Sequence, residues 1–229
     1  MKHLRNLGDL IDRENDLSKP ALIDLSVREK VRRFSHEDID AAAKAMARGL
    51  VKKGFKRGDH IAILAANSAE FLIAYLGTMR AGMISIPINH KFPSETIEFI
   101  LSDAACKLVF TDQDRLSQVP IGYPVVVFSG TDENNFDNWL DWGDFETIIP
   151  EKNEVAMFLY TSGSTGRPKG VPLTHEGHLW VIEMRLRQKP EPFHKMLVAA
   201  PLYHMNGLAI CKVALAAHLT IVLLPQFDA

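Results

Sequence analysis

Apolar and polar positions alternate in a regular way from about residue 35 onward. Ser35, three residues before Asp38, is a helix-capping pattern. Apolar residues then recur at helical spacing as far as Leu50, and Gly54 is well placed to end the helix. An apolar run over residues 60–65 follows, as a buried strand requires. The pattern therefore predicts a helix followed by a strand.

The same rhythm continues as far as residue 111. Predicted helices cover residues 68–79 and 94–101, and predicted strands cover residues 83–88 and 107–111. Strands that are joined through helices usually run parallel, with the helices packed on both faces of the sheet. We therefore expect a parallel sheet that is covered by helices.

Residues 112–154 are less regular. They contain a predicted strand at 124–128, followed by an acidic and aromatic segment at 131–145. We interpret this segment as a surface loop with a short helix near Trp139. Trp139 and Trp142 are expected to pack the loop onto the protein, because large aromatic side chains are most often used in this way.

A second regular block begins at Val155. Its predicted strands cover residues 155–160, 196–200 and 219–224, an extended piece covers 171–173, and its helices cover 174–187 and 208–217. The whole pattern predicts an α/β protein with mainly parallel sheets flanked by helices. We expect two subdomains, 1–150 and 151–229. The second is expected to be incomplete, because the sequence stops directly after a strand.

Composition narrows the class of protein. The chain has 229 residues, of which 47% are hydrophobic and 24% are charged, and its formal net charge is −2, which gives no indication of a nucleic-acid partner. Cys106 and Cys211 are far apart in sequence and are expected to be buried and unpaired. The sequence shows neither a signal peptide nor an apolar run long enough to span a membrane, so we expect a cytoplasmic protein.

A loop rich in glycine and hydroxyl groups follows the strand that ends at Tyr160. The loop consists of Thr161, Ser162, Gly163, Ser164, Thr165, Gly166, Arg167, Pro168, Lys169 and Gly170. Glycines allow successive backbone N–H groups to converge on an anion, and the hydroxyl groups add further donors. Lys169 supplies a compact positive charge for phosphate oxygens. The loop is therefore predicted to bind phosphate rather than to be a flexible surface connection.

Two better-known loops do not fit this segment. A Walker A loop has lysine directly after its last glycine and opens a helix, but here two residues separate Gly166 from Lys169. A nucleophile elbow centred on Ser164 needs glycine at the position of Ser162.

The nearby pair His175 and His178 suggests a zinc motif only superficially. A zinc-binding H-E-x-x-H helix requires its second histidine at position 179, which is Leu179. We predict no metal site at this pair.

Residues 159–170 resemble the phosphate-binding signature of the adenylate-forming superfamily. This superfamily includes acyl-CoA synthetases, the adenylation domains of nonribosomal peptide synthetases, and luciferases. The resemblance extends to residues 171–175, 201–208, 59–82 and 87–89. It is greatest to an acyl-CoA synthetase acting on fatty acids, and it covers the N-terminal part of such an enzyme.

The resemblance implies a two-step reaction. A carboxylic acid attacks the α-phosphate of ATP to give acyl-AMP and pyrophosphate, and CoA then displaces AMP. By the resemblance, the phosphate-binding residues are Thr161, Ser162, Gly163, Ser164, Thr165, Gly166 and Lys169. Thr161 matches a position associated with Mg²⁺, and His204 matches a position beside the acyl carboxylate. ATP, Mg²⁺ and CoA are the implied cofactors.

Parts of the superfamily pattern have no counterpart up to Ala229. These are an acidic Mg²⁺ ligand, the adenine-binding residues and a C-terminal domain with a catalytic lysine. We therefore expect the 229-residue chain alone to have no ligase activity. Three alternatives stay open: a non-catalytic module that binds a nucleotide or an acyl group, an adenylation domain of another adenylate-forming enzyme, and a fragment that forms a homodimer. The acyl chain is not determined, although the helix predicted at 208–217 is expected to form one wall of its site.

Overall fold

The larger of two β-sheets forms the centre of the fold. The computed structural model describes residues 4–27, 29–130, 133–161, 167–187 and 195–225. The strands of the larger sheet are β3 (His60–Leu64), β4 (Ile84–Pro87), β5 (Leu108–Thr111), β6 (Val125–Val127), β7 (Val155–Thr161) and β8 (Lys169–Thr174). Their order is β6–β5–β3–β4–β7–β8, and all neighbours are parallel except β7 and β8.

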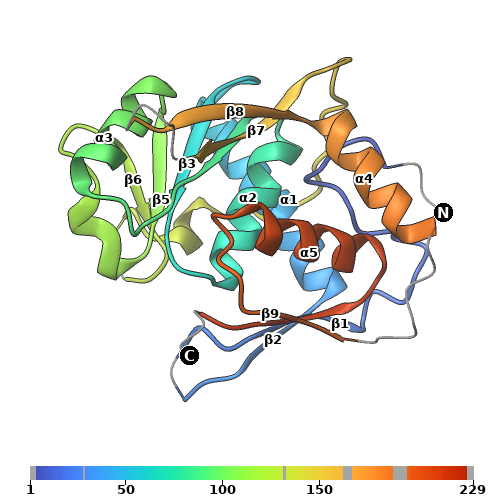
Figure 1. The fold of residues 1–229 in the computed structure, drawn as a ribbon. Coiled ribbons are helices and arrows are strands. Elements are labelled where there is room, and N and C mark those ends of the chain that lie inside the picture. The colour runs from blue at the N-terminus through green and yellow to red at the C-terminus, as the bar shows by residue number, and fades with distance from the viewer. Residues whose placement is uncertain (1–3, 28, 131–132, 162–166, 188–194, 226–229) are drawn as a thin grey trace.

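A smaller sheet lies at the lower edge of Figure 1. Its strands are β1 (Pro20–Asp24), β2 (Arg32–Ser35), β9 (Lys195–Val198) and β10 (Thr220–Leu223), in the order β2–β1–β10–β9. Strand β10 is parallel to both β1 and β9, whereas β2 is antiparallel to β1. Strands β1 and β2 precede the region in which the sequence pattern predicts elements, so this sheet was not foreseen as a unit.

The helices match the predicted ones to within a few residues at each end. They are α1 (His36–Lys52), α2 (Ala69–Arg80), α3 (Ser94–Asp103), α4 (His175–Arg187) and α5 (Met205–Ala216), with short 3₁₀ turns η1 (Gln113–Gln118) and η2 (Phe136–Trp139). Ser35 and Asp38 form the predicted capping box, and Ser68 caps α2 by accepting the N–H of Phe71. The predicted α/β fold of mainly parallel sheets flanked by helices is confirmed.

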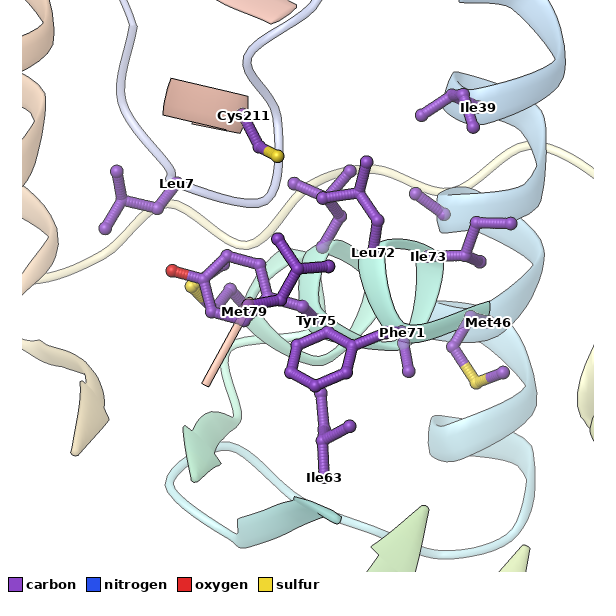
Figure 2. Close-up of a cluster of buried hydrophobic side chains, with 14 of the residues drawn as sticks. Leu7, Ile39, Met46, Ile63, Phe71, Leu72, Ile73, Tyr75, Met79 and Cys211 are labelled. Carbon is purple, nitrogen blue, oxygen red and sulfur yellow. The ribbon is translucent and has the colours of Figure 1, made fainter. Parts of the chain in front are cut away.

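Helices α1, α2 and α5 occupy the space between the two sheets (Figure 1). Strand β3 shows how the core is divided, because its side chains alternate between two faces. Ile61 and Ile63 face the cluster beneath α1 and α2, where Figure 2 shows Phe71 next to Ile63. Ala62 and Leu64 face a second cluster, which is covered by α3. None of the helices within the described ranges is long and apolar enough to cross a bilayer.

Asn67 joins the two sheets. Its side-chain amide donates hydrogen bonds to the carbonyl oxygens of Ala200 (3.1 Å) and Leu224 (3.0 Å). Its side-chain oxygen accepts the N–H of Leu202 at 2.7 Å. Asn67 follows strand β3 of the larger sheet, and its three partners flank strands β9 and β10 of the smaller one. One buried amide therefore links the two sheets.

Each sheet takes strands from both sides of residue 150. Strands β7 and β8 complete the larger sheet, and strands β1 and β2 pair with the C-terminal strands of the smaller sheet. The sheets therefore do not follow the boundary predicted between 1–150 and 151–229, and that division of the chain into domains stays a prediction.

The cysteines and tryptophans behave mostly as expected. Cys106 and Cys211 are buried and unpaired, and burial raises the pKa of each thiol to about 12. Trp139 is 8% exposed and packs against Phe110. Trp142, in contrast, is 61% exposed, so only one of the two tryptophans packs the loop onto the core.

His36 is a buried histidine whose two ring nitrogens have no hydrogen-bond partner among the described residues. Its ring stacks on that of His218 at 3.8 Å. Burial, together with the neighbouring His218, lowers the pKa of His36 to about 4. A histidine in the unfolded chain titrates near 6.5, so the unfolded state binds more protons between these two pH values. His36 therefore makes the fold less stable as the pH falls from about 6.5 toward 4.

His36→Phe is expected to increase the free energy of unfolding by about 1 kcal/mol or more, because it removes two unsatisfied buried nitrogens. It should also reduce the loss of stability between pH 7 and pH 5. Urea unfolding of both proteins at these two pH values checks the prediction, with the exposed His204 replaced by phenylalanine as a control. An identical pH dependence in the parent and in His36→Phe would contradict it.

Candidate functional site

The predicted phosphate loop connects two antiparallel strands. In the hairpin of β7 and β8, Thr161 pairs with Lys169 and Tyr160 pairs with Gly170. Side chains that are directly opposite in such a pair lie on the same face, with their Cβ atoms about 5 Å apart. Both Thr161 and Lys169 are exposed. The two ends of the loop therefore bring a hydroxyl group and an ammonium group together on one face.

The middle of the loop is not placed. Ser162, Gly163, Ser164, Thr165 and Gly166 lie outside the described residues. Of the predicted phosphate-binding residues, the structure thus places Thr161 and Lys169, one at each end. The roles of all seven stay predictions.

The base of the loop is attached to helix α3. The Tyr160 hydroxyl donates a hydrogen bond to the carboxylate of Asp103 at 2.6 Å. A Cβ atom on Gly170 would lie only 3.0 Å from the Tyr160 ring, so glycine leaves room for this ring. On the other side of the loop, the guanidinium of Arg167 lies 5.6 Å from the centre of the Phe99 ring. These residues carry no predicted role, and their contacts indicate that they hold the hairpin in place.

His204 lies at the N-terminus of helix α5. It is exposed, its N–H donates to the carbonyl of Pro201 at 3.0 Å, and its side chain does not cap the helix. The Tyr203 ring lies 4.7 Å from the His204 ring and 5.1 Å from the His90 ring, between ring centres. A Cβ atom on Gly207 would lie 2.5 Å from the Pro201 carbonyl oxygen, so this tight entry into α5 requires glycine.

The strand ends that lead to Thr161 and to His90 lie at one edge of the larger sheet. Strands β4 and β7 are parallel neighbours, with Ser85 paired with Met157. Continuing this register brings Asn89 level with Thr161, and His90 follows directly. The carboxyl edge of a parallel sheet is where ligands bind in open α/β folds. The sequence pattern did not single out His90 as part of this aromatic cluster, although its position shortly after a predicted strand could have indicated it.

The two histidines of the rejected zinc motif face different partners. His175 is buried, and its Nδ1 accepts the N–H of Leu7 at 3.0 Å. His178 faces Lys212 of α5, with 3.1 Å between Nδ1 and Nζ. Burial lowers the pKa of each histidine to about 4. Within the described ranges, no three histidine, cysteine or acidic residues gather as a metal site would require.

A Mg²⁺ ion that is bound together with a nucleotide needs few ligands from the protein. It usually takes one or two protein oxygens, and phosphate oxygens and water complete its shell. The exposed hydroxyl of Thr161, at the mouth of the loop, fits this requirement.

Comparison with known proteins identifies the family. Residues 12–229 match the AMP-binding enzyme family, and the chain belongs to it. The long-chain-fatty-acid–CoA ligase FadD13 of Mycobacterium tuberculosis is 28% identical over 210 residues, which cover 86% of this chain and 41% of the ligase. Tyrocidine synthase 1 of Brevibacillus parabrevis is 30% identical over 199 residues, which cover 76% of this chain and 18% of the synthase.

A solved structure supports the same assignment. ATP-bound MatB from Rhodopseudomonas palustris matches with a TM-score of 0.84 and 28% identity, covering 97% of this chain and 45% of MatB. The chain thus spans less than half of each of these proteins. The resemblance to the adenylate-forming superfamily is confirmed.

Proposed function

We propose that this chain is the phosphate-binding part of an enzyme that activates a carboxylic acid with ATP and transfers the acyl group to CoA. The observation that carries the proposal is the pairing of Thr161 with Lys169 across the two ends of a loop rich in glycine and hydroxyl groups. The similarity to a fatty-acid–CoA ligase supports the reaction, and the similarity to an ATP-bound structure supports the nucleotide.

Each predicted residue has a defined role in this proposal. The β- and γ-phosphates of ATP are bound by Thr161, Ser162, Gly163, Ser164, Thr165, Gly166 and Lys169. Thr161 also contributes its hydroxyl to Mg²⁺. Donors that are aimed at phosphate oxygens stabilise the charge that develops as pyrophosphate leaves.

His204 contacts the carboxylate of the acid in this proposal. Its position at the start of α5 suits an anion, because the free N–H groups and the dipole of a helix N-terminus favour negative charge. The first turn of α5 carries no acidic residue that would oppose it.

A second candidate function has its own support. The similarity to tyrocidine synthase 1 also fits an adenylation domain that passes its activated acid to an acceptor other than CoA. A module that binds a nucleotide or an acyl group without catalysis is the remaining alternative. Binding of CoA distinguishes the ligase from both, since only the ligase needs it.

Calorimetric titration of the 229-residue chain with ATP and Mg²⁺ tests the proposal. We expect saturable binding that tripolyphosphate competes away, because both ligands would occupy the same loop. With ATP, Mg²⁺ and a panel of fatty acids, we expect no release of pyrophosphate from the chain alone. A failure to bind ATP would contradict the phosphate-binding role, and sustained pyrophosphate release would contradict the predicted inactivity.

A further inference from the structure

Lys212 is a buried cation in the mainly apolar helix α5. It is 1% exposed, and its Nζ lies 3.1 Å from Nδ1 of His178 on α4. Burial lowers the pKa of Lys212 to about 8, so at neutral pH it is mainly an ammonium group beside a neutral imidazole. Within the described part of the chain, no carboxylate forms an ion pair with it. A lysine is rarely buried without such a partner, because desolvation of the charge is costly.

A cavity lies between α4 and α5, and Lys212 lines it. Its volume is about 490 Å³, and its polar lining residues are Lys212, His178, Arg185 and Asn206. The other lining residues are apolar, and none is acidic. Asn206 is only two residues from His204, so the cavity follows α5 away from the proposed position of the reacting carboxylate. The lining of the cavity is thus mainly apolar, and its charged groups, Lys212 and Arg185, are both positive.

We propose that this cavity binds a second carboxylate, at the far end of the substrate acid, and that Lys212 is its counter-ion. The proposal rests on the proposed function, and it identifies the substrate class as medium-chain dicarboxylic acids. His204 and Lys212 are eight residues apart on α5, which corresponds to a separation of about 12 Å along the helix axis. An apolar chain of this length would connect the two carboxylates.

The charges around Lys212 favour a carboxylate over other occupants. An apolar acyl tail would leave the ammonium group unpaired. A phosphate carries about two negative charges, whereas this largely apolar cavity offers one buried cation to neutralise them. The remaining groups nearby are His178 and Arg185 of α4 and the neutral thiol of Cys211 on α5, and none of these is an anion. An ammonium group has three donors and spends one on His178, so donors remain for a carboxylate.

Calorimetry with matched ligands tests this proposal on the 229-residue chain in the absence of ATP. Decanedioate and decanoate have the same chain length and differ in the far carboxylate. We expect decanedioate to bind at least tenfold more tightly, as a charge-assisted hydrogen bond to a buried ammonium group should provide. Lys212→Met should abolish this preference. Lys195→Met, which removes an exposed lysine of β9, should leave it unchanged.

Each other outcome has a defined meaning. Equal binding of the two acids by the parent chain, or no binding of either, overturns the dicarboxylate site even if Lys212→Met does not fold. A loss of CoA binding in Lys212→Met with decanedioate unaffected would assign the cavity to a CoA phosphate and also overturn the proposal. ATP binding is measured separately, so failure of this site leaves the proposed function standing. Loss of ATP binding contradicts the proposed function and, with it, the assignment of the bound dicarboxylate as a substrate.

Discussion

Asp40→Ala is expected to lower the free energy of unfolding by about 3 kcal/mol, because it removes the nearer of the two carboxylates that pair with a buried arginine and leaves only Asp9, at 3.7 Å. The arginine is Arg80 of α2, which is 1% exposed. Its Nη1 donates to Oδ1 of Asp40 at 2.9 Å, and its Nε donates to the carbonyl of Gly8 at 2.9 Å. Arg13 binds the same carboxylate at 2.7 and 2.9 Å. The cluster ties α1 and α2 to the N-terminal segment.

Urea unfolding at pH 7 measures this loss, and Asp144→Ala is the matched control. The Asp144 side chain is fully exposed, with its Oδ1 3.6 Å from Nζ of Lys44, so its removal should leave the free energy of unfolding nearly unchanged. Although burial opposes it, Arg13 and Arg80 together hold the pKa of Asp40 below its usual value. The contribution of Asp40 should therefore be fully present above pH 4 and be lost as the pH falls further. Equal decreases in the free energy of unfolding for Asp40→Ala and Asp144→Ala would show that the Asp40–Arg80–Arg13 cluster does not stabilise the fold.

The elements between residues 35 and 111 were predictable because each one carries its own local signals. Ser35 and Ser68 cap α1 and α2 as the sequence indicates, and the apolar periodicity places the buried faces. The extended piece after the phosphate loop was also predicted. It distinguishes this loop from a Walker A loop, which is followed by a helix. Its pairing with β7 then follows from the short connection between the two strands.

The smaller sheet was not predictable in the same way. In this sheet Leu22 pairs with Ile221, and no local pattern specifies a partner about 200 residues away. The contacts of His90 with Tyr203 and of His178 with Lys212 were unpredictable for the same reason, since each joins elements that are distant in sequence. Of these residues, Lys212 carried a signal as a charged residue inside an apolar helical run, and His90 carried one through its position after a predicted strand. The sequence therefore indicated the loop chemistry, and the fold added the groups that surround it.

Lys169→Ala is expected to weaken binding of ATP by about tenfold or more, which corresponds to the loss of a charge-assisted contact with phosphate. The Lys169 ammonium lies on the same face as Thr161 at the mouth of the loop. It is exposed, so its removal should leave the thermal stability nearly unchanged. The decrease in ATP affinity caused by Lys169→Ala should be smaller at high salt, because salt screens the interaction of an exposed charge with phosphate.

Comparison of ATP with AMP gives the sharpest test of Lys169. AMP lacks the β- and γ-phosphates, so Lys169→Ala should change its binding much less than that of ATP. Arg167→Ala removes a neighbouring charge that packs on Phe99, and it should leave ATP binding within about threefold of the parent, as expected for a weak long-range effect. If Lys169→Ala weakened ATP and AMP equally, or if Arg167→Ala had the larger effect, Lys169 would not bind the terminal phosphates. Calorimetry at low and high salt supplies all of these affinities.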